Sequence, residues 1–155
     1  MRTLTTLLIG LIFINCTSQS SQSEFTYTCS DDLKPYVFMY LEALEKHGIK
    51  FNDQNFIVVF DADIMRTKLV GQARGMHNDK LVYVQINPKL WGVLTHKQKT
   101  HLIFHELSHD IFNIEHTELI VLMKPSMTSP SVSLAMDIDR EIITLMSYIK
   151  VTKHK

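Results

Sequence analysis

The sequence predicts an α+β domain in which a small mixed sheet packs on one long helix and a further helix ends the chain. Residues 56–60 and 81–86 are short apolar runs rich in β-branched residues, which predict buried strands. Before and after these runs, apolar residues recur at helical spacing. A chain of 155 residues suits one compact domain with a sizeable core.

The first helix is predicted between a pair of aspartates and a stop signal. Asp31 and Asp32 can cap and charge its start, and His47-Gly48 supplies the stop. Between them, apolar residues recur at helical spacing, namely Val37, Tyr40, Leu41 and Leu44.

Three strands are predicted to follow this helix. Residues 56–60 and 81–86 give the stronger signals, and residues 68–73 predict a weaker strand between them. Asn87-Pro88 ends the last strand, because proline cannot continue a central ladder.

Two more helices are predicted in the second half of the chain. Thr95 is a good N-cap for a long helix that carries His101, His105 and His109. Residues 127–133 are rich in Ser and Pro and predict a loop. Residues 137–149 predict the last helix, with apolar residues at helical spacing.

The amino-terminal segment differs in kind from the rest. Residues 1–15 have the pattern of a secretory signal, with Arg2 before an apolar run at residues 7–14 that is too short to span a bilayer. Cys16 directly follows, which resembles the lipidation site of bacterial lipoproteins, although Asn15 is less usual before the Cys. Residues 16–24 then predict a lipidated Cys with a flexible Ser/Gln tether. The alternative is an ordinary signal in which Cys16 is incidental.

These features predict the location and partners of the chain. We expect a cell-envelope protein that is lipid-anchored to a bacterial membrane, at the outer membrane or the periplasmic face, or alternatively secreted. Cys29 is then a lone thiol; a Cys16–Cys29 disulfide is the competing interpretation and excludes lipidation. The 16 basic and 16 acidic residues balance, which gives no support for a nucleic-acid partner, and we expect a monomer.

The chemistry-bearing residues form an H-E-x-x-H motif within the long helix. His105 and His109 lie four residues apart on one face, so both imidazoles can bind one Zn²⁺. Glu106 is placed to activate a zinc-bound water without being a ligand, and His116 is a candidate third ligand that leaves the fourth position open. The motif favours a zinc-dependent peptidase. The alternative, two polar His at a core edge, leaves Glu106 unexplained.

This stretch resembles the metzincins, a clan of zinc peptidases whose pattern is H-E-x-x-H-x-x-G-x-x-H followed by a Met-turn. The matching residues are His105, Glu106, His109, His116 and Met123. Residues 122–125, Leu-Met-Lys-Pro, are similar to the Met-turn of matrix metalloproteinases, and residues 81–126 also resemble a group of small bacterial zinc-dependent lipoproteins.

Two departures from the metzincin pattern concern the helix and the third ligand. Ser108 stands where these families have Gly, so we expect looser packing of the helix there. One extra residue separates His109 from His116, and Asn113 is predicted to make the left-handed turn that the family's Gly makes. The competing third ligands are Glu115, Glu118 and Asp110.

The resemblance also implies roles for these residues. Glu106 would take a proton from the water and deliver it to the leaving amine, and Met123 would form an apolar floor beneath the metal. Tyr83 and Tyr148 are possible oxyanion stabilisers, although a core or surface role is the commoner one for a Tyr. We expect His101 to support or pack against the site, His96 and His77 to lie at the surface, and Trp91 to pack the helix against the sheet.

Residues 25–155 are therefore predicted to form a metzincin-like zinc metallopeptidase domain that cleaves a peptide or protein substrate. A non-catalytic zinc-binding lipoprotein domain that recognises a peptide or cell-envelope partner is the first alternative. A structural lipoprotein in which the motif is incidental is the second.

Overall fold

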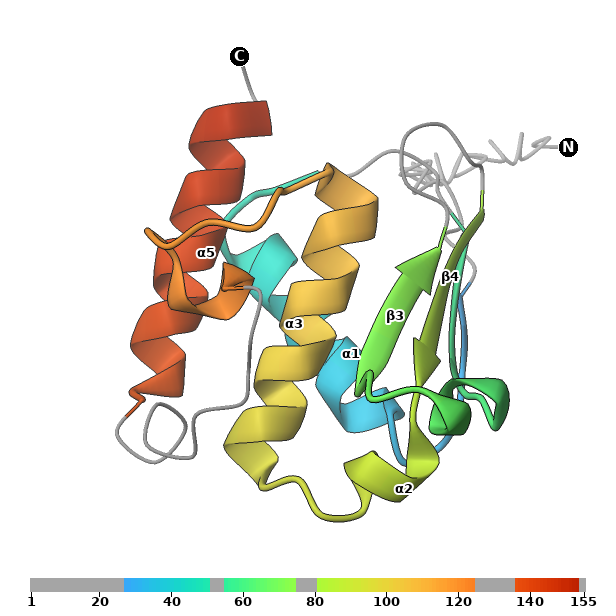
Figure 1. The fold of residues 1–155 in the computed structure, drawn as a ribbon. Helices are drawn as coiled ribbons and strands as arrows, with labels where there is room; N and C mark the ends of the chain where they lie inside the picture. Colours follow the sequence, from blue (N-terminus) through green and yellow to red (C-terminus); the bar gives the residue numbers. More distant parts are fainter. Residues whose placement is uncertain (1–26, 51–54, 75–80, 125–135, 154–155) are drawn as a thin grey trace, which may run out of the picture.

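A computed structural model of the chain describes residues 27–50, 55–74, 81–124 and 136–153. Within these residues the fold is α+β, with a mixed sheet of four strands and four helices, one of them C-terminal (Figure 1). The predicted fold class is confirmed. Cys16 and the predicted segments 1–15, 16–24 and 127–133 lie outside the described residues, and so does His77.

The sheet has the strand order β1-β2-β4-β3. Its strands are β1 (Tyr27–Cys29), β2 (Asn55–Phe60), β3 (Gly71–Arg74) and β4 (Leu81–Ile86). β1, β2 and β4 are parallel, whereas β3 pairs with β4 in the antiparallel sense and lies at the edge. β1 was not expected, and β2 and β4 agree with the predicted strands to within one residue.

The weaker strand begins three residues later than predicted. Residues just before it form a 3-10 helix, η1 (Asp63–Arg66), and the Thr67 hydroxyl donates to the Ile64 carbonyl at 2.7 Å. The chain is still bending at Lys68, so pairing with β4 starts only at Gly71.

The three long helices lie on one side of the sheet, with α3 packed on β3 and β4 and α5 packed on α3 (Figure 1). Val82, Val84 and Ile86 alternate along β4 and are fully buried against them. Successive side chains of a strand point to opposite faces, so Tyr83 points away from the helices.

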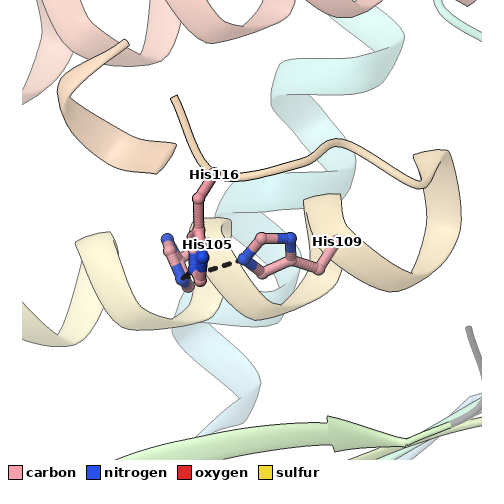
Figure 2. A group of neighbouring side chains, drawn as sticks. All are labelled: His105, His109 and His116. Carbon is pink, nitrogen blue, oxygen red and sulfur yellow. Dashed lines mark hydrogen bonds between the residues drawn. The ribbon is translucent and has the colours of Figure 1, made fainter. Parts of the chain in front are cut away.

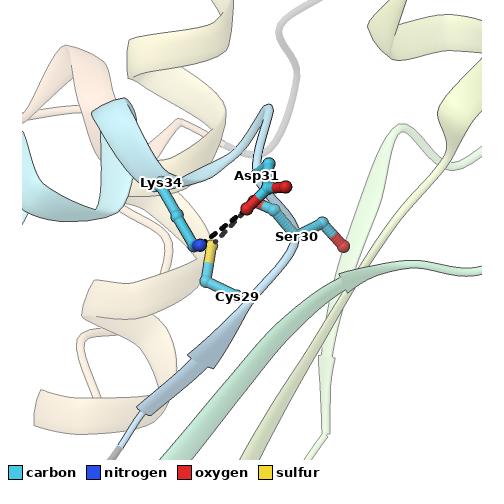
Figure 3. A network of polar contacts seen from close by, with 4 residues as sticks. All are labelled: Cys29, Ser30, Asp31 and Lys34. Carbon is cyan, nitrogen blue, oxygen red and sulfur yellow. Dashed lines mark hydrogen bonds and ion pairs between the residues drawn. The ribbon is translucent and has the colours of Figure 1, made fainter.

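Helix α1 (Lys34–Lys46) ends as predicted but begins differently. Its N-cap is Leu33, with no side-chain cap, so the prediction that the aspartates cap it is wrong. The Ser30 carbonyl instead accepts from the Leu33 and Lys34 amides, and Lys34 pairs with Asp31 at 2.6 Å (Figure 3). At the other end, Gly48 adopts φ +64° and stops the helix.

A short helix, α2 (Pro88–Trp91), follows β4 directly and was not expected. The Asn87 side chain that ends the strand also caps this helix, because it accepts from the Lys89 and Leu90 amides. Trp91 is 5 % exposed, and its ring packs edge-on against that of Phe60 in β2. The ammonium of Lys99, in the next helix, lies 4.9 Å from the centre of the Trp91 ring. Trp91 therefore packs that helix against the sheet, as predicted.

The long helix is α3 (His96–Phe112), and it begins at a capping box formed by Thr95 and Gln98. Every residue from Thr100 to Phe112 is buried, because the sheet, α1, α5 and the turn after α3 surround the helix. The 3-10 helix η2 (Val121–Met123) forms that turn.

The last helix, α5 (Ile138–Lys153), runs four residues beyond the predicted end and packs Leu145, Met146 and Ile149 into the core. Within the described ranges no helix is long and apolar enough to cross a membrane.

Candidate metal centre

Three imidazoles converge beside the carboxyl-terminal half of α3. His105 and His109 come from the helix and His116 from the segment after it (Figure 2). The Nε2 atom of His105 lies 3.0 Å from that of His109 and 3.2 Å from that of His116. Nitrogen ligands of a tetrahedral zinc lie about 3.3 Å apart, given Zn–N bonds of about 2.0–2.1 Å. The spacing of the three nitrogens therefore fits a single metal ion.

Hydrogen bonds fix the orientation of the two helical imidazoles. His105 Nδ1 donates to the Leu122 carbonyl at 2.7 Å, and His109 Nδ1 donates to the Ile114 carbonyl. A neutral imidazole with its proton on Nδ1 directs the lone pair of Nε2 into the cluster. Lone pairs that face one another at 3.0 Å repel, and a cation between them removes that repulsion.

Burial keeps these imidazoles neutral, as metal ligands must be. Burial lowers the pKa of His105 to about 3, while its bond to the Leu122 carbonyl opposes the shift. Burial also lowers the pKa of His109. His101 is buried one turn earlier, with its ring 5.9 Å from that of His105 and its pKa lowered to about 4 by burial. It packs against the site, as predicted.

A left-handed turn brings the third imidazole back to the helix. Asn113 adopts φ 49° and ψ 46°, which confirms the predicted turn. The Ile114 amide then donates to the Ser108 carbonyl at 3.2 Å. Beyond His116, the Thr117 amide donates to the Met123 carbonyl at 3.0 Å, so the backbone of η2 holds the segment that carries His116.

The acidic residues considered as alternatives to His116 lie elsewhere. Glu115 and Glu118 are exposed, and Glu118 pairs with Lys124 at 3.0 Å. Asp110 is buried and has no hydrogen-bond partner within the described chain, and burial raises its pKa to about 7. In that part of the chain the three histidines are the only group of His, Cys, Asp and Glu side chains close enough to hold a metal.

Glu106 lies on the side of α3 that faces β3. It is 9 % exposed, and burial, followed by repulsion from Asp110, raises its pKa to about 7. A hydrogen bond from the Ala73 amide partly opposes this shift. A dication held by the histidines would lower the same pKa.

Gly71 permits this close approach of β3 to α3. A Cβ added there would lie 2.9 Å from Leu102 Cδ1 and 3.1 Å from Glu106 Oε1. Sequence reasoning missed Gly71 and Ala73. A glycine inside a predicted strand was the available signal, since it often marks close contact with another element.

The turn at Val121–Met123 contacts His105 directly. Leu122 and Met123 are fully buried in η2, and the Leu122 carbonyl binds His105. Ser108 does not leave α3 loosely packed as expected, because its hydroxyl and that of buried Tyr40 on α1 lie 3.1 Å apart in a hydrogen bond.

The remaining candidates are Tyr83 on the sheet, Tyr148 on α5 and His96 at the start of α3. Tyr83 is on the far face of the sheet, and Tyr148 is 38 % exposed on α5. The exposed His96 contacts the Tyr36 hydroxyl at 3.2 Å.

No protein-family model matches this chain, and no curated protein or solved structure does so either. The resemblance to metzincins thus stays a prediction, and what the structure contributes is a cluster of three histidines that can hold a metal ion.

Proposed function

We propose that this chain is a zinc-dependent peptidase of the cell envelope. The observation that carries the proposal is the convergence of three Nε2 atoms at α3, the helix that also carries the buried carboxylate of Glu106. Three imidazoles with one open position are the donor set of a catalytic zinc, and neutral imidazole suits zinc well. When bound, zinc would polarise the scissile carbonyl and acidify a water molecule.

Glu106 is the proposed general base. Its burial favours the protonated form, so the carboxylate can accept a proton from the attacking water and later deliver it to the leaving nitrogen. The Ala73 amide fixes one side of the carboxylate, which keeps it in position through both transfers. Leu122 and Ile114 carbonyls hold the His105 and His109 rings and maintain the cluster.

The edge strand supports a peptide as the class of substrate. Among the described strands β3 pairs only with β4, so no described strand pairs with its other edge. That edge runs beside Glu106, which the Ala73 amide binds. An extended peptide can add to such an edge through the backbone groups that Glu106 does not occupy, which would place a peptide bond beside Glu106.

A lipid on Cys16 is the proposed means of attachment to the membrane. The short apolar run that ends at Cys16 and the Ser/Gln tether after it support this. Mass spectrometry of the native amino terminus tests it: the chain should begin at Cys16 and carry the added mass of lipid. An unmodified Cys16, or cleavage after it, excludes the anchor.

Glu106→Gln tests the catalytic proposal. The amide cannot accept the proton, so cleavage of a broad peptide library should fall by about 10²–10⁴ or more. Zinc content should persist, because the three histidines are untouched. Glu45→Gln, an exposed carboxylate on α1, is the matched control and should keep full activity.

Two results would overturn the catalytic proposal. Equal cleavage by the wild type and Glu106→Gln excludes the mechanism. A wild type that binds zinc fully and cleaves no peptide in the library instead favours the non-catalytic zinc-binding domain.

A further inference from the structure

Four exposed lysines gather where α1 and α5 end. The Lys150 ammonium donates to the His47 carbonyl at 3.0 Å, which brings the ends of the two helices together although 103 residues separate them. We call this surface the lysine patch, and it consists of Lys46, Lys50, Lys150 and Lys153. No ion pair among the described residues includes any of the four.

The charge of the lysine patch is only partly balanced. Glu42 and Glu45 are the acidic residues of the last turns of α1, and α5 has none after Glu141. A lysine in the last turn of a helix interacts favourably with the helix dipole, which explains the positions of Lys46, Lys150 and Lys153. Lys50 has no such explanation, because it lies beyond the end of α1. Val151, which follows Lys150 directly, is 64 % exposed. Basic and apolar side chains occur together on surfaces that meet lipid headgroups.

The chain enters the domain at the same end. β1 runs parallel to β2 with Tyr27 opposite Phe56, so the start of β1 lies beside the start of β2. β2 begins shortly after Lys50, at the end of the molecule where α1 and α5 end (Figure 1). The segment from Cys16 to Tyr27 can span at most about 40 Å when fully extended. A lipid on Cys16 would therefore hold this end of the domain close to a bilayer.

We propose that the lysine patch docks on a bilayer that contains anionic phospholipids, with the lipid phosphates as its partners. The proposal rests on the lipid anchor proposed above, which brings the patch within reach of the membrane. Each lysine near an anionic leaflet contributes about fivefold to the binding constant. Docking would orient the domain relative to the membrane.

Co-flotation of the full chain with vesicles tests this proposal. One set of vesicles is phosphatidylcholine alone, and in the other phosphatidylglycerol replaces part of it. The apolar amino-terminal run and any lipid on Cys16 bind both kinds of vesicle. The ratio of the two partition coefficients therefore isolates the contribution of charge, and it should be about tenfold or more at low salt and fall towards one at high salt.

Two variants with equal changes in charge locate the effect. The first combines Lys46→Gln, Lys50→Gln, Lys150→Gln and Lys153→Gln, and its ratio should fall to about one. The control replaces four exposed cations at the opposite ends of these helices and strands, namely Arg66→Gln, Lys68→Gln, Lys89→Gln and Arg140→Gln. The control should keep the wild-type ratio. Circular dichroism and zinc content confirm that both variants fold.

The outcomes that overturn the docking proposal are separate from those that overturn the peptidase proposal. Equal loss in both variants shows a general charge effect, and binding to soluble polyphosphate without any preference for anionic vesicles shows a different partner; either result excludes lipid docking. The vesicle ratio does not depend on zinc or hydrolysis. An inactive protein that keeps the ratio would therefore contradict the peptidase proposal but not the docking proposal. An unmodified Cys16 would remove the anchor on which docking rests, whereas the vesicle ratio would still measure whether the lysine patch binds anionic lipid.

Discussion

His116 is the exposed member of the cluster, and the only one that the helix itself does not position. We predict that His116→Ala weakens zinc binding by at least about a hundredfold, because loss of a ligand exceeds the 10–100-fold cost of losing a group that merely supports one. Glu115→Ala, which removes the neighbouring exposed carboxylate, should bind zinc like the wild type. Competition with a chromophoric chelator measures both constants. Weaker binding by Glu115→Ala with no change in His116→Ala would show that the ligand set is wrong.

Cys29 should react slowly in the folded protein. Burial raises the pKa of this thiol from 9.0 to about 11, and Lys34 only partly offsets the shift. The thiolate is the reactive form, so at pH 8 alkylation should be about a hundredfold slower than in the unfolded chain. Between pH 8 and pH 10 the rate should rise about tenfold per pH unit.

Mass spectrometry of the peptide that contains Cys29 follows this alkylation without interference from Cys16. An equal rate in the folded and unfolded chains would show that the thiol is not buried. A lack of dependence on pH would show that its pKa lies below the range tested.

Two of the three clustered histidines and Glu106 could be predicted from the sequence because their placement is local. The spacing of His105, Glu106 and His109 fixes their relation once the segment is a helix. Asn113 predicted the turn, since Asn tolerates a positive φ. Ala73, which binds Glu106, could not be predicted, because that contact depends on how a strand some thirty residues earlier packs on the helix.

At the scale of secondary structure, the end of α3 decides where the imidazole of His116 lies. Asn113→Gly should leave stability and zinc affinity close to those of the wild type, because Gly adopts the left-handed region freely. The change also removes the Asn113 amide oxygen, which is buried and unpaired within the described chain. Asn113→Val should lose about 1–2 kcal/mol of unfolding free energy, because a β-branched side chain is strained there.

Denaturant unfolding and zinc competition test the two Asn113 variants together. The strained turn also moves the Ile114 carbonyl that His109 binds, so zinc affinity should fall with stability in Asn113→Val. Equal zinc affinity in the Val and Gly variants would mean that the turn does not position His116.

The strands with strong hydrophobic patterns were predicted well, and the errors lie where short-range polar contacts decide a boundary. β2 and β4 follow from apolar composition alone. The predicted cap of α1 was wrong because Asp31 binds the Lys34 side chain rather than the helix amides. The late start of β3 results from the Thr67 turn, whose contact with a backbone carbonyl gives no hydrophobic signal.

At the scale of the whole molecule, the metal should couple several distant segments. His105 and His109 belong to α3, His116 to the segment held by η2, and η2 also packs on α5. A bound ion would therefore tie the core helix to the turn that covers it. The Tyr40–Ser108 hydrogen bond ties the same helix to α1 on its other side.

Removal of the metal should accordingly lower the thermal stability of the whole domain. Zinc held at a hundred times its dissociation constant stabilises the folded state by about 2.7 kcal/mol, which corresponds to about 5–10 °C in melting temperature for a domain of this size. A strong chelator should cause that loss, and added zinc should reverse it. The His105→Ala variant should have the same melting temperature with and without chelator, because it does not bind the zinc that would stabilise it. If the wild type also melts at one temperature while zinc analysis shows that the chelator removed the ion, the metal is not coupled to the fold, and the three histidines bind it without stabilising the contact between α3 and η2.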